Sequence, residues 1–511
     1  MSNYDAIVVG SGNAGMLAAL TMQHAGKNVL LLEQNHKPGG SSGDFVRGRF
    51  HFESSLHELM SGIGTKEHPG DLYQMFDELG VSDKVNIVRV PHLPLVNILP
   101  DGKKVILHHG QTPEELTAEL IKNFPEDEAG IKRFMHKMLP FAQQFGEYLM
   151  DQIGQNEDED YSGDEFKELR QLSFHRMEEI YDECDFSQDL RTTFHAKLDY
   201  FANTPTEMQP GFILAQFLQL FEDGSYVERG SQALTDGLIA TFKEQGGTLL
   251  LDTKVKKILV EDGKTTGVLT EQGQTYKSDM VLSDMLPTRT YIDLVGEENT
   301  PESIINQMNK SSIGYSTTDL FLGLDCPPEE IGLESPLNFL DFSYDLDDAK
   351  RLWKTFEVPD HLLVSSHTVD NRKFSPEGTS EVAIFSYQAA DQWINLDPSE
   401  YFTMKEKFAE EMLEKTERIY PNIREHIEEA ELATPLTVMH YINEPKGSIM
   451  GWRIGNRTNV TTGTTMVQSP IKGLYTTGAG VGPGYYHAYK AGNSVAKVML
   501  DRMKTAVAGG K

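Results

Sequence analysis

The sequence is poor in cysteine, in basic residues and in long apolar runs. Two cysteines, Cys184 and Cys326, occur among 511 residues, and they lie far apart without metal-binding spacing, so no disulfide framework or cysteine-based metal site is indicated. Lysine and arginine total 46 against 77 aspartate and glutamate residues, which gives a formal net charge of −31. We expect no nucleic-acid partner, because phosphates require a basic patch and none stands out.

Membrane-spanning segments are also lacking, since no uninterrupted apolar run reaches the ~18 residues that cross a bilayer. The first predicted strand begins close to Met1, so we expect no signal peptide. The sequence therefore predicts a cytoplasmic protein with reduced thiols that is attached, at most, to a membrane surface. The acidic run Asn156-Glu157-Asp158-Glu159-Asp160 is typical of a solvated loop rather than of a binding site.

The first 33 residues carry the strongest positive signal. The apolar run Ala6-Ile7-Val8-Val9 precedes the glycine motif Gly10-Ser11-Gly12-Asn13-Ala14-Gly15, and a second apolar run, Asn28-Val29-Leu30-Leu31-Leu32, ends before Glu33. This order predicts a strand, a glycine turn, a helix and a second strand, which is the arrangement of a dinucleotide-binding fold. A turn with a purely structural role is the alternative.

Each part of this motif has a chemical reason. Gly10 permits the tight turn, Gly12 lets the backbone approach a pyrophosphate, and Gly15 allows the helix to pack on the strand. The pyrophosphate would lie at the positive end of the helix that begins near Ala14. The carboxylate of Glu33 can accept both hydroxyls of an adenosine ribose, and it would repel a 2′-phosphate, so a phosphorylated dinucleotide is disfavoured.

A second glycine pair follows in His36-Lys37-Pro38-Gly39-Gly40-Ser41-Ser42. Flavoproteins bring the backbone against the diphosphate and ribityl chain at this position, whereas nicotinamide enzymes have no such element, so FAD is the predicted cofactor. A plain Pro-Gly turn between strands is the alternative. The candidate cofactor-binding residues of this region are Gly10, Gly12, Asn13, Ala14, Gly15, Glu33, Gln34, Gly39, Gly40, Ser41 and Ser42.

Residues 44–59 contain two candidate catalytic side chains. Alternation and an Arg-Gly turn predict a hairpin over residues 44–53 that returns toward the cofactor. Glu53 and His57 would then lie near the flavin. A lone histidine is more often a structural group than a catalytic one, so spacing does not decide the role of His57.

The region from about residue 69 to residue 220 changes character and predicts an inserted helical layer. Residues 210–221, at its end, are apolar on nearly every face, as in a buried helix. A membrane-facing or substrate-tunnel wall is the alternative. Helical periodicity is found over residues 113–124, 129–150, 166–184 and 189–201.

Residues 230–282 predict a return to the nucleotide-binding fold. An amphipathic helix over 230–245 and a strand over 248–252 precede a β-meander, in which Val255 is placed beside the adenine. Beyond residue 288 the signals are mixed, and a sheet joined to the helical insert would form a substrate chamber. The meander strands are predicted at 254–260, 266–270 and 275–282, the chamber strands at 319–325 and 382–387, and a helix at 401–420.

The segment that begins at residue 473 carries the strongest functional signal after the first 33 residues. A strand over 473–477, the turn Gly478-Ala479-Gly480-Val481-Gly482-Pro483-Gly484 and a helix follow one another. A second dinucleotide site is disfavoured, because no further strand and no ribose acid come after the helix. A flavin-ring site is favoured, since the helix N-terminus can stabilise negative charge on the reduced ring. Its candidate residues are Gly480, Gly484, Tyr485, Tyr486 and His487.

These segments predict an α/β fold in which two domains are interwoven. Residues 1–68, 222–290 and 467–503 are assigned to a discontinuous Rossmann-like domain that binds the dinucleotide. Residues 69–221 and 291–466 are assigned to a mixed α+β substrate-binding domain with the helical insert. Residues 504–511 are assigned to a tail.

The chain resembles the phytoene-desaturase family of flavoproteins, which includes carotenoid desaturases, carotenoid cis–trans isomerases and retinol saturases. The stretch Phe52-Glu53-Ser54-Ser55-Leu56-His57 is similar to the saturase and isomerase branch, although an Asp is common where this chain has Glu53, so the branch stays open. The other matching residues are Gly10, Gly12, Gly15, Glu33, Lys37-Pro38-Gly39-Gly40, Gly230, Ser283-Asp284, Thr434-Pro435-Leu436-Thr437, Gly447-Ser448-Ile449-Met450-Gly451, Gly478-Ala479-Gly480 and Pro483-Gly484.

The resemblance implies a GR2-type flavoprotein that binds FAD non-covalently and moves a hydride between flavin N5 and a carbon of a long apolar substrate. Desaturation or saturation of a carotenoid, retinoid or fatty acyl chain is the favoured reaction. A redox-neutral polyene isomerase that needs reduced FAD and an amine-oxidase-type enzyme are the alternatives. Glu53, His57, Tyr486 and His487 are the candidates for supplying a proton. The electron donor or acceptor stays open, and no metal is predicted.

Overall fold

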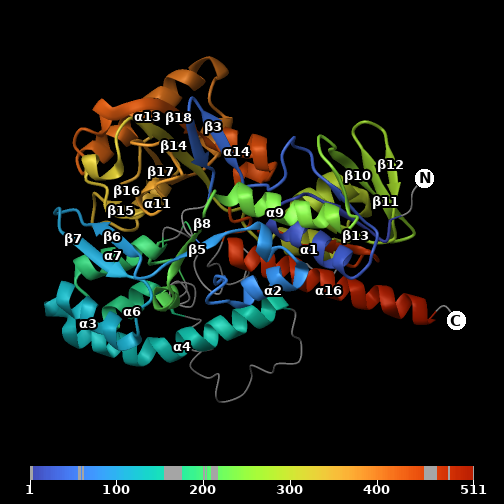
Figure 1. Ribbon diagram of the computed structural model, residues 1–511, viewed down its shortest axis with the longest axis horizontal. Helices are drawn as coiled ribbons and strands as arrows, with labels where there is room; N and C mark the ends of the chain where they lie inside the picture. The colour runs from blue at the N-terminus through green and yellow to red at the C-terminus, as the bar shows by residue number, and fades with distance from the viewer. Residues whose placement is uncertain are drawn as a thin grey trace.

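The computed structural model describes most of the chain (Figure 1). The described residues are 4–55, 59, 63–154, 175–198, 202, 204–208, 217–453, 469–481 and 484–509. His57 and most of the apolar stretch 210–221 lie outside them, as do residues 166–174 of one predicted helix.

A five-stranded parallel sheet is built from three separate pieces of the chain. The strand order is β19 (Leu474–Thr476), β13 (Val281–Ser283), β1 (Ala6–Val9), β2 (Val29–Leu32) and β9 (Thr248–Leu250). Its strands are short apolar runs because both faces are covered, as parallel sheets require. This sheet confirms the predicted α/β, Rossmann-like architecture.

Alternate side chains of this sheet enter two different cores. One face, which includes Ala6 and Val8, packs on α1 (Asn13–His24), α9 (Ser231–Glu244) and α16 (Tyr485–Gly509). The other face, which includes Ile7 and Val9, packs beneath the meander and the π-helix Thr288–Gly296. The meander strands are β10 (Val255–Glu261), β11 (Lys264–Thr270) and β12 (Thr275–Lys277).

One strand prediction was wrong in extent. Residues 275–282 were expected to form a single meander strand, but they divide into β12 and β13, which belong to different sheets. The chain turns at Ser278, whose hydroxyl donates to the carbonyl O of Met280 and accepts from its N–H. The second half then pairs with β1 and β19 in the parallel sheet.

A seven-stranded mixed sheet forms the second domain-sized unit, at the upper left of Figure 1. Helix α13 (Tyr401–Glu417) packs on one of its faces, where Phe408 and Met412 meet the even-numbered side chains of β14. In spatial order its strands are β18 (Ile427–Ala433), β14 (Ser316–Leu324), β17 (Ser380–Gln388), β16 (His361–Ser365), β15 (Leu337–Asp341), β6 (Pro94–Ile98) and β7 (Lys104–His108).

The helical layer is present, but the prediction for it was incomplete. A cluster of phenylalanines, which includes Phe134, Phe186 and Phe194, holds four helices together. The layer is preceded by β5 (Ile87–Val90), β6 and β7, and the last two join the seven-stranded sheet. The turn Pro100-Asp101-Gly102 between two apolar runs was the available hairpin signal. The helices are α3 (Pro113–Asn123), α4 (Glu128–Gly154), α6 (Met177–Glu183) and α7 (Gln188–Leu198).

Short elements complete the described fold. The predicted hairpin over 44–53 is confirmed as β3 (Asp44–Arg47) and β4 (Phe50–Glu53), and β5 pairs with β8 (Gly224–Val227). In the described residues, no helix is both long enough and apolar enough to cross a membrane. The remaining short helices are α2 (Asp71–Leu79), α10 (Glu302–Met308), α11 (Ala349–Leu352), α12 (Asp391–Ile394) and α14 (Pro435–Ile442).

The first and last long helices pack directly on each other, as the blue α1 and red α16 of Figure 1 show. The hydroxyl of Tyr489 donates to Oδ1 of Asn13 at 2.9 Å. Gly492 lies so close to the backbone of Ala14 that a Cβ there would clash with the Ala14 carbonyl. The two ends of the chain are therefore joined at one place in the fold.

Candidate functional site

A cavity of about 1380 Å³ runs from the parallel sheet to the seven-stranded sheet. One end is lined by the loops that follow β1, β2 and β13, together with the loop before α16. Ligands of open α/β sheets bind beyond the carboxyl ends of the strands, so this end of the cavity is where a dinucleotide is expected. The other end is lined by one face of β14, β15, β16 and β17.

The glycine motif forms a close-packed cradle at the first end. Gly10 has a φ of +98°, which favours glycine, and a Cβ on Gly15 would clash with the carbonyl O of Gly10. The second glycine pair docks on this turn, because the Gly39 N–H donates to the carbonyl O of Ser11 at 2.9 Å. A Cβ on Gly40 would lie 3.2 Å from the Cα of Gly12. The two predicted loops therefore meet at this end of the cavity.

Glu33 lies at the end of β2 beside this cradle and is 5% exposed. Its Oε2 accepts hydrogen bonds from the N–H and the hydroxyl of Ser11, at 2.9 and 2.6 Å, and its Oε1 accepts from the Asn35 N–H at 2.9 Å. A carboxylate offers about four acceptor positions, so capacity remains for ribose hydroxyls. Val255, the residue placed beside adenine, lines the same part of the cavity.

Asp284 is a buried acid. It is one of the residues that carry the family resemblance, but it was not among the predicted site residues. It follows β13, and its carboxyl lies against Gly10, Gly12 and Gly15 and accepts backbone hydrogen bonds from Gly12 and Gly15. Burial raises the pKa of Asp284 well above its usual range. Its position directly after an apolar strand was the signal for it.

The C-terminal glycine turn lines the cavity with Gly480 and Gly484. Gly482 and Pro483 lie outside the described residues. Tyr485, Tyr486 and His487, at the start of α16, also line the cavity, so the predicted ring-site residues come together with the N-terminal cradle.

The hydroxyls of the two tyrosines are already engaged. The Tyr485 hydroxyl lies 3.3 Å from Oγ of Ser55, and burial raises the pKa of Tyr485 to about 12. The Tyr486 hydroxyl donates to Oδ2 of Asp71 at 2.8 Å. Burial and this carboxylate raise the pKa of Tyr486 further above its usual range. Both phenols are therefore weak acids in this structure.

Glu53 lines the cavity but has a structural partner that the sequence did not reveal. Its carboxyl accepts from the N–H of Ser231 at 2.5 Å and from the Ser231 hydroxyl at 2.6 Å, at the start of α9. Gly230 leaves the space for it, because a Cβ there would clash with Oε1 of Glu53. Burial raises the pKa of Glu53 to about 7, against the opposing effects of His367 and Ser231. Such a carboxyl can exchange a proton near neutral pH.

The far wall of the cavity is one face of the seven-stranded sheet. Every second residue of β14 and β17 points into the cavity, while the intervening residues face α13. Residues 210–221 were expected to form a buried helix, with a substrate-tunnel wall as the alternative, and of that stretch the described Leu218 and Gln219 line the cavity. The sheet residues that line it are Thr317, Asp319, Phe321, Phe339, Leu363, Ser365, Glu381, Ala383, Phe385, Tyr387, Glu431 and Ala433.

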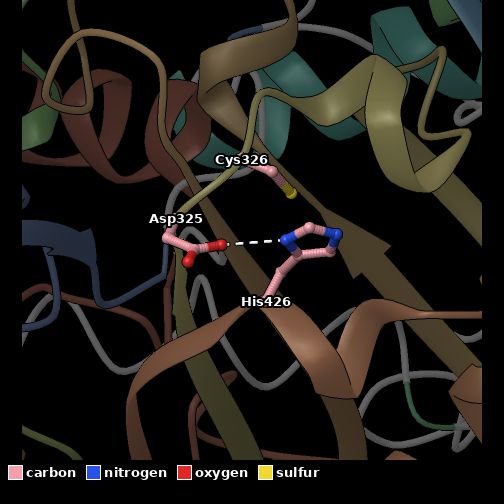
Figure 2. A group of neighbouring side chains, drawn as sticks. All are labelled: Asp325, Cys326 and His426. Carbon is pink, nitrogen blue, oxygen red and sulfur yellow. Dashed lines mark hydrogen bonds and ion pairs between the residues drawn. The ribbon is translucent and has the colours of Figure 1, made fainter.

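Outside the cavity, Asp325, Cys326 and His426 form a group of metal-ligand types (Figure 2). Their ligand atoms lie within 4.8 Å of one another, and Oδ1 of Asp325 is 2.8 Å from Nδ1 of His426. Burial, together with Glu330 and Asp325, raises the pKa of the Cys326 thiol to about 11. Asp325 is exposed and Cys326 is buried, and the Asp325–His426 contact already engages two of the three side chains with each other.

The fold and the site together define an FAD-dependent oxidoreductase. Residues 13–283, more than half of the chain, match the family model described as flavin containing amine oxidoreductase, and the chain belongs to this family. The predicted cofactor, FAD, is confirmed by this membership.

Two curated relatives cover nearly the whole chain. The all-trans-retinol 13,14-reductase of Danio rerio is 25% identical over 507 residues, which are 93% of this chain and 82% of the relative. The prolycopene isomerase of Daucus carota is 25% identical over 495 residues, which are 94% of this chain and 77% of the relative. The predicted resemblance to retinol saturases and carotenoid isomerases is confirmed.

Solved structures share the fold at low sequence identity. An oxidoreductase from Methanosarcina mazei superposes with a TM-score of 0.65 at 18% identity, over 97% of this chain and 99% of the other. Putrescine oxidase bound to putrescine superposes with a TM-score of 0.65 at 15% identity, over 98% of this chain and 99% of the other. These likenesses confirm the predicted fold class.

Replacing Gly12 with valine is expected to abolish retention of FAD. The new Cβ would lie 2.6 Å from Oδ2 of Asp284 and would close the approach to the diphosphate. The ratio of flavin to protein absorbance after purification measures the loss. Gly263→Val is the control, because Gly263 has open space around it in the turn between β10 and β11. Its positive φ strains the control variant, whereas the φ of Gly12 is −68° and adds no such strain to the test variant. A yellow, fully loaded Gly12→Val protein would refute the assignment of this loop.

Glu53 is expected to make the stability of the protein depend on pH. Its pKa rises from an ordinary 4.5 to about 7 on folding, so between these values the folded state holds a proton that the unfolded state has lost. The free energy of unfolding should therefore fall as pH rises through this window, by ~3 kcal/mol in all at 1.36 kcal/mol per pKa unit.

Urea unfolding of the wild type and of Glu53→Gln at several pH values measures this effect. The wild type should lose stability relative to the variant between pH 4.5 and about 7, and no further above that range. The exposed Glu414→Gln is the matched control. Parallel pH curves for the wild type and Glu53→Gln would show that Glu53 is not the titrating group.

Proposed function

We propose that this oxidoreductase acts on carbon–carbon bonds of a long, apolar, unsaturated molecule, by desaturation or saturation. The observation that carries the proposal is the far wall of the cavity, to which neighbouring strands contribute the apolar side chains of Phe321, Phe339, Leu363, Ala383 and Phe385. Burial of apolar area gives about 0.8 kcal/mol per methylene, so such a wall can hold a lipid chain with few polar contacts. The names of the curated relatives, a retinol reductase and a prolycopene isomerase, support the same class of molecule.

The size of the cavity agrees with two occupants. Pockets for one drug-sized ligand are roughly 300–1,000 Å³, and this cavity is about 1380 Å³. It therefore has room for a cofactor at the glycine loops and for a second molecule along the sheet. The residues that would hold FAD are the predicted N-terminal set with Val255, and Gly480, Gly484 and Tyr485 at the C-terminal turn.

Bound FAD supplies the hydride acceptor or donor for this chemistry. The protein's own residues orient the substrate, exclude water and move a proton. Among the side chains proposed for the proton, Glu53 has a pKa of about 7, which suits proton exchange near neutral pH. Tyr486 is the least suitable, since its hydroxyl is tied to Asp71. His487 lines the cavity, and His57 lies outside the described residues.

A redox-neutral isomerase and an amine oxidase are the second candidates, each favoured by one observation. A relative named prolycopene isomerase covers most of the chain, and the family model is named for amine oxidoreductases. Acidic side chains also line the chamber, Asp319 and Glu381 among them, and these would suit a cationic amine.

Anaerobic incubation of the FAD-loaded protein with a polyene separates these functions. Bleaching of oxidised flavin together with a product two mass units lighter is expected for desaturation, and reoxidation of pre-reduced flavin with a product two units heavier is expected for saturation. A product of unchanged mass would show isomerisation instead. The amine oxidase requires a separate aerobic incubation with putrescine. If the polyenes do not react and putrescine gives oxygen-dependent release of peroxide, the protein is an amine oxidase.

Two large apolar side chains are found among the exposed residues that line the cavity, beside charged ones such as Lys37 and Arg47. Val46 and Tyr441 line the cavity and are 47% and 54% exposed. A molecule of the proposed class partitions into lipid, so we propose that these two side chains touch a membrane surface. Flotation with liposomes should recover the wild type and recover less of Tyr441→Glu, whereas Phe402→Glu, an exposed change on α13, serves as control. Equal recovery of wild type and Tyr441→Glu would exclude this mode of contact.

A further inference from the structure

The carboxyl of Asp319 is an unexplained feature of the chamber wall. Asp319 lies in the middle of β14, is 8% exposed and lines the cavity. Its cross-strand neighbours are Phe385 on one side and Ala433 on the other, so it interrupts a row of apolar side chains. A buried carboxyl that lacks hydrogen-bond partners costs free energy, which makes its presence there informative.

Asp319 differs from the other acids of this wall in how it is held. The Glu381 carboxyl accepts from the hydroxyls of Thr368 and Ser375, and Glu431 pairs with Lys405 at 2.7 Å. The carboxyl of Asp319 accepts from the Thr317 hydroxyl at 2.7 Å, and the described residues provide no other hydrogen-bond partner for it. A carboxyl has more hydrogen-bonding capacity than one partner satisfies. The unused capacity lies inside the cavity.

The chemistry of the missing partner follows from the protonation of this carboxyl. Burial raises the pKa of Asp319 to about 7, and Thr317 opposes the rise. Near neutral pH the group is therefore present both as the acid and as the carboxylate. A hydroxyl donates to the carboxylate and accepts from the acid, so it pairs with both forms. An ammonium group pairs with the carboxylate alone.

We propose that Asp319 and Thr317 anchor a hydroxyl group of the substrate, so that the chamber selects a long apolar alcohol over the corresponding hydrocarbon or ether. This inference rests on the proposed function, because it adds a polar end group to the same unsaturated molecule. The alcohol would lie along the sheet with its hydroxyl at β14 and its chain over Phe321, Phe385 and Leu363, which share this face.

Binding of two probes to the FAD-loaded protein tests the anchor. The probes are all-trans-retinol and its methyl ether, which keeps the polyene and the oxygen but cannot donate a hydrogen bond. Quenching of protein fluorescence gives the two dissociation constants. The wild type is expected to bind the alcohol about tenfold more tightly than the ether, the ratio that a modest hydrogen-bond difference produces.

Substitutions test which side chains produce the preference for the alcohol over the ether. Asp319→Ala should bring the ratio close to one, Asp319→Asn should keep part of it, and Thr317→Val should lower it. Phe321→Leu, two residues along the same face of β14, is the matched control and should weaken both probes while keeping the ratio. Retained flavin and an unchanged circular dichroism spectrum identify the variants that are folded.

The experiment distinguishes failure of the hydroxyl anchor from failure of the proposed function. If the wild type binds both probes equally, or if Asp319→Ala and Asp319→Asn both keep the wild-type ratio, the anchor is refuted while an apolar polyene site stands. If neither probe binds and putrescine is oxidised, the proposed function fails, and the anchor fails with it.

Discussion

The packing of α1 on α16 is the contact on which the cavity depends. Gly492 lies against the backbone of Ala14, and the Thr21 hydroxyl, about two turns further along α1, donates to Oδ1 of Asn493 at 3.3 Å. Because each helix begins at a glycine loop, this packing places both loops at the same end of the cavity. The cofactor end is therefore a property of two segments that are remote in sequence, and neither segment could form it alone.

Much of this end could be predicted from the sequence, because its signals are local. A glycine turn, a helix start and Glu33 at the end of a strand are constrained by the nearest residues of the chain. The division of residues 275–282 into β12 and β13 was missed for the opposite reason. Their length is compatible with one strand, and the partners β1 and β19, far away in sequence, decide where it divides.

The roles of side chains at the site were also hard to predict where they depend on partners far away in sequence. Glu53 and Glu33 are both acids that end apolar strands, yet Glu53 bonds to Ser231, 178 residues away, and no local pattern announces that contact. Asp319 begins a predicted strand, but only the register of the folded sheet places it in the wall of the cavity. The sequence predicted a chamber that includes the strands at 319–325 and 382–387, but it did not show which of their residues face the cavity, because the pairing of β14 and β17 decides this.

The order of strands in the parallel sheet has a consequence for biosynthesis. β1 lies at the centre of the sheet, but its neighbour β13 and the edge strand β19 come from later parts of the chain. The ribosome synthesises the amino end first. The β1 edge of the nascent sheet therefore stays unpaired until β13 has been synthesised, and the β13 edge stays unpaired until β19 follows. Such an edge attracts other strands, and shielding by chaperones is expected to matter until release. Flavin insertion then belongs among the last steps of maturation.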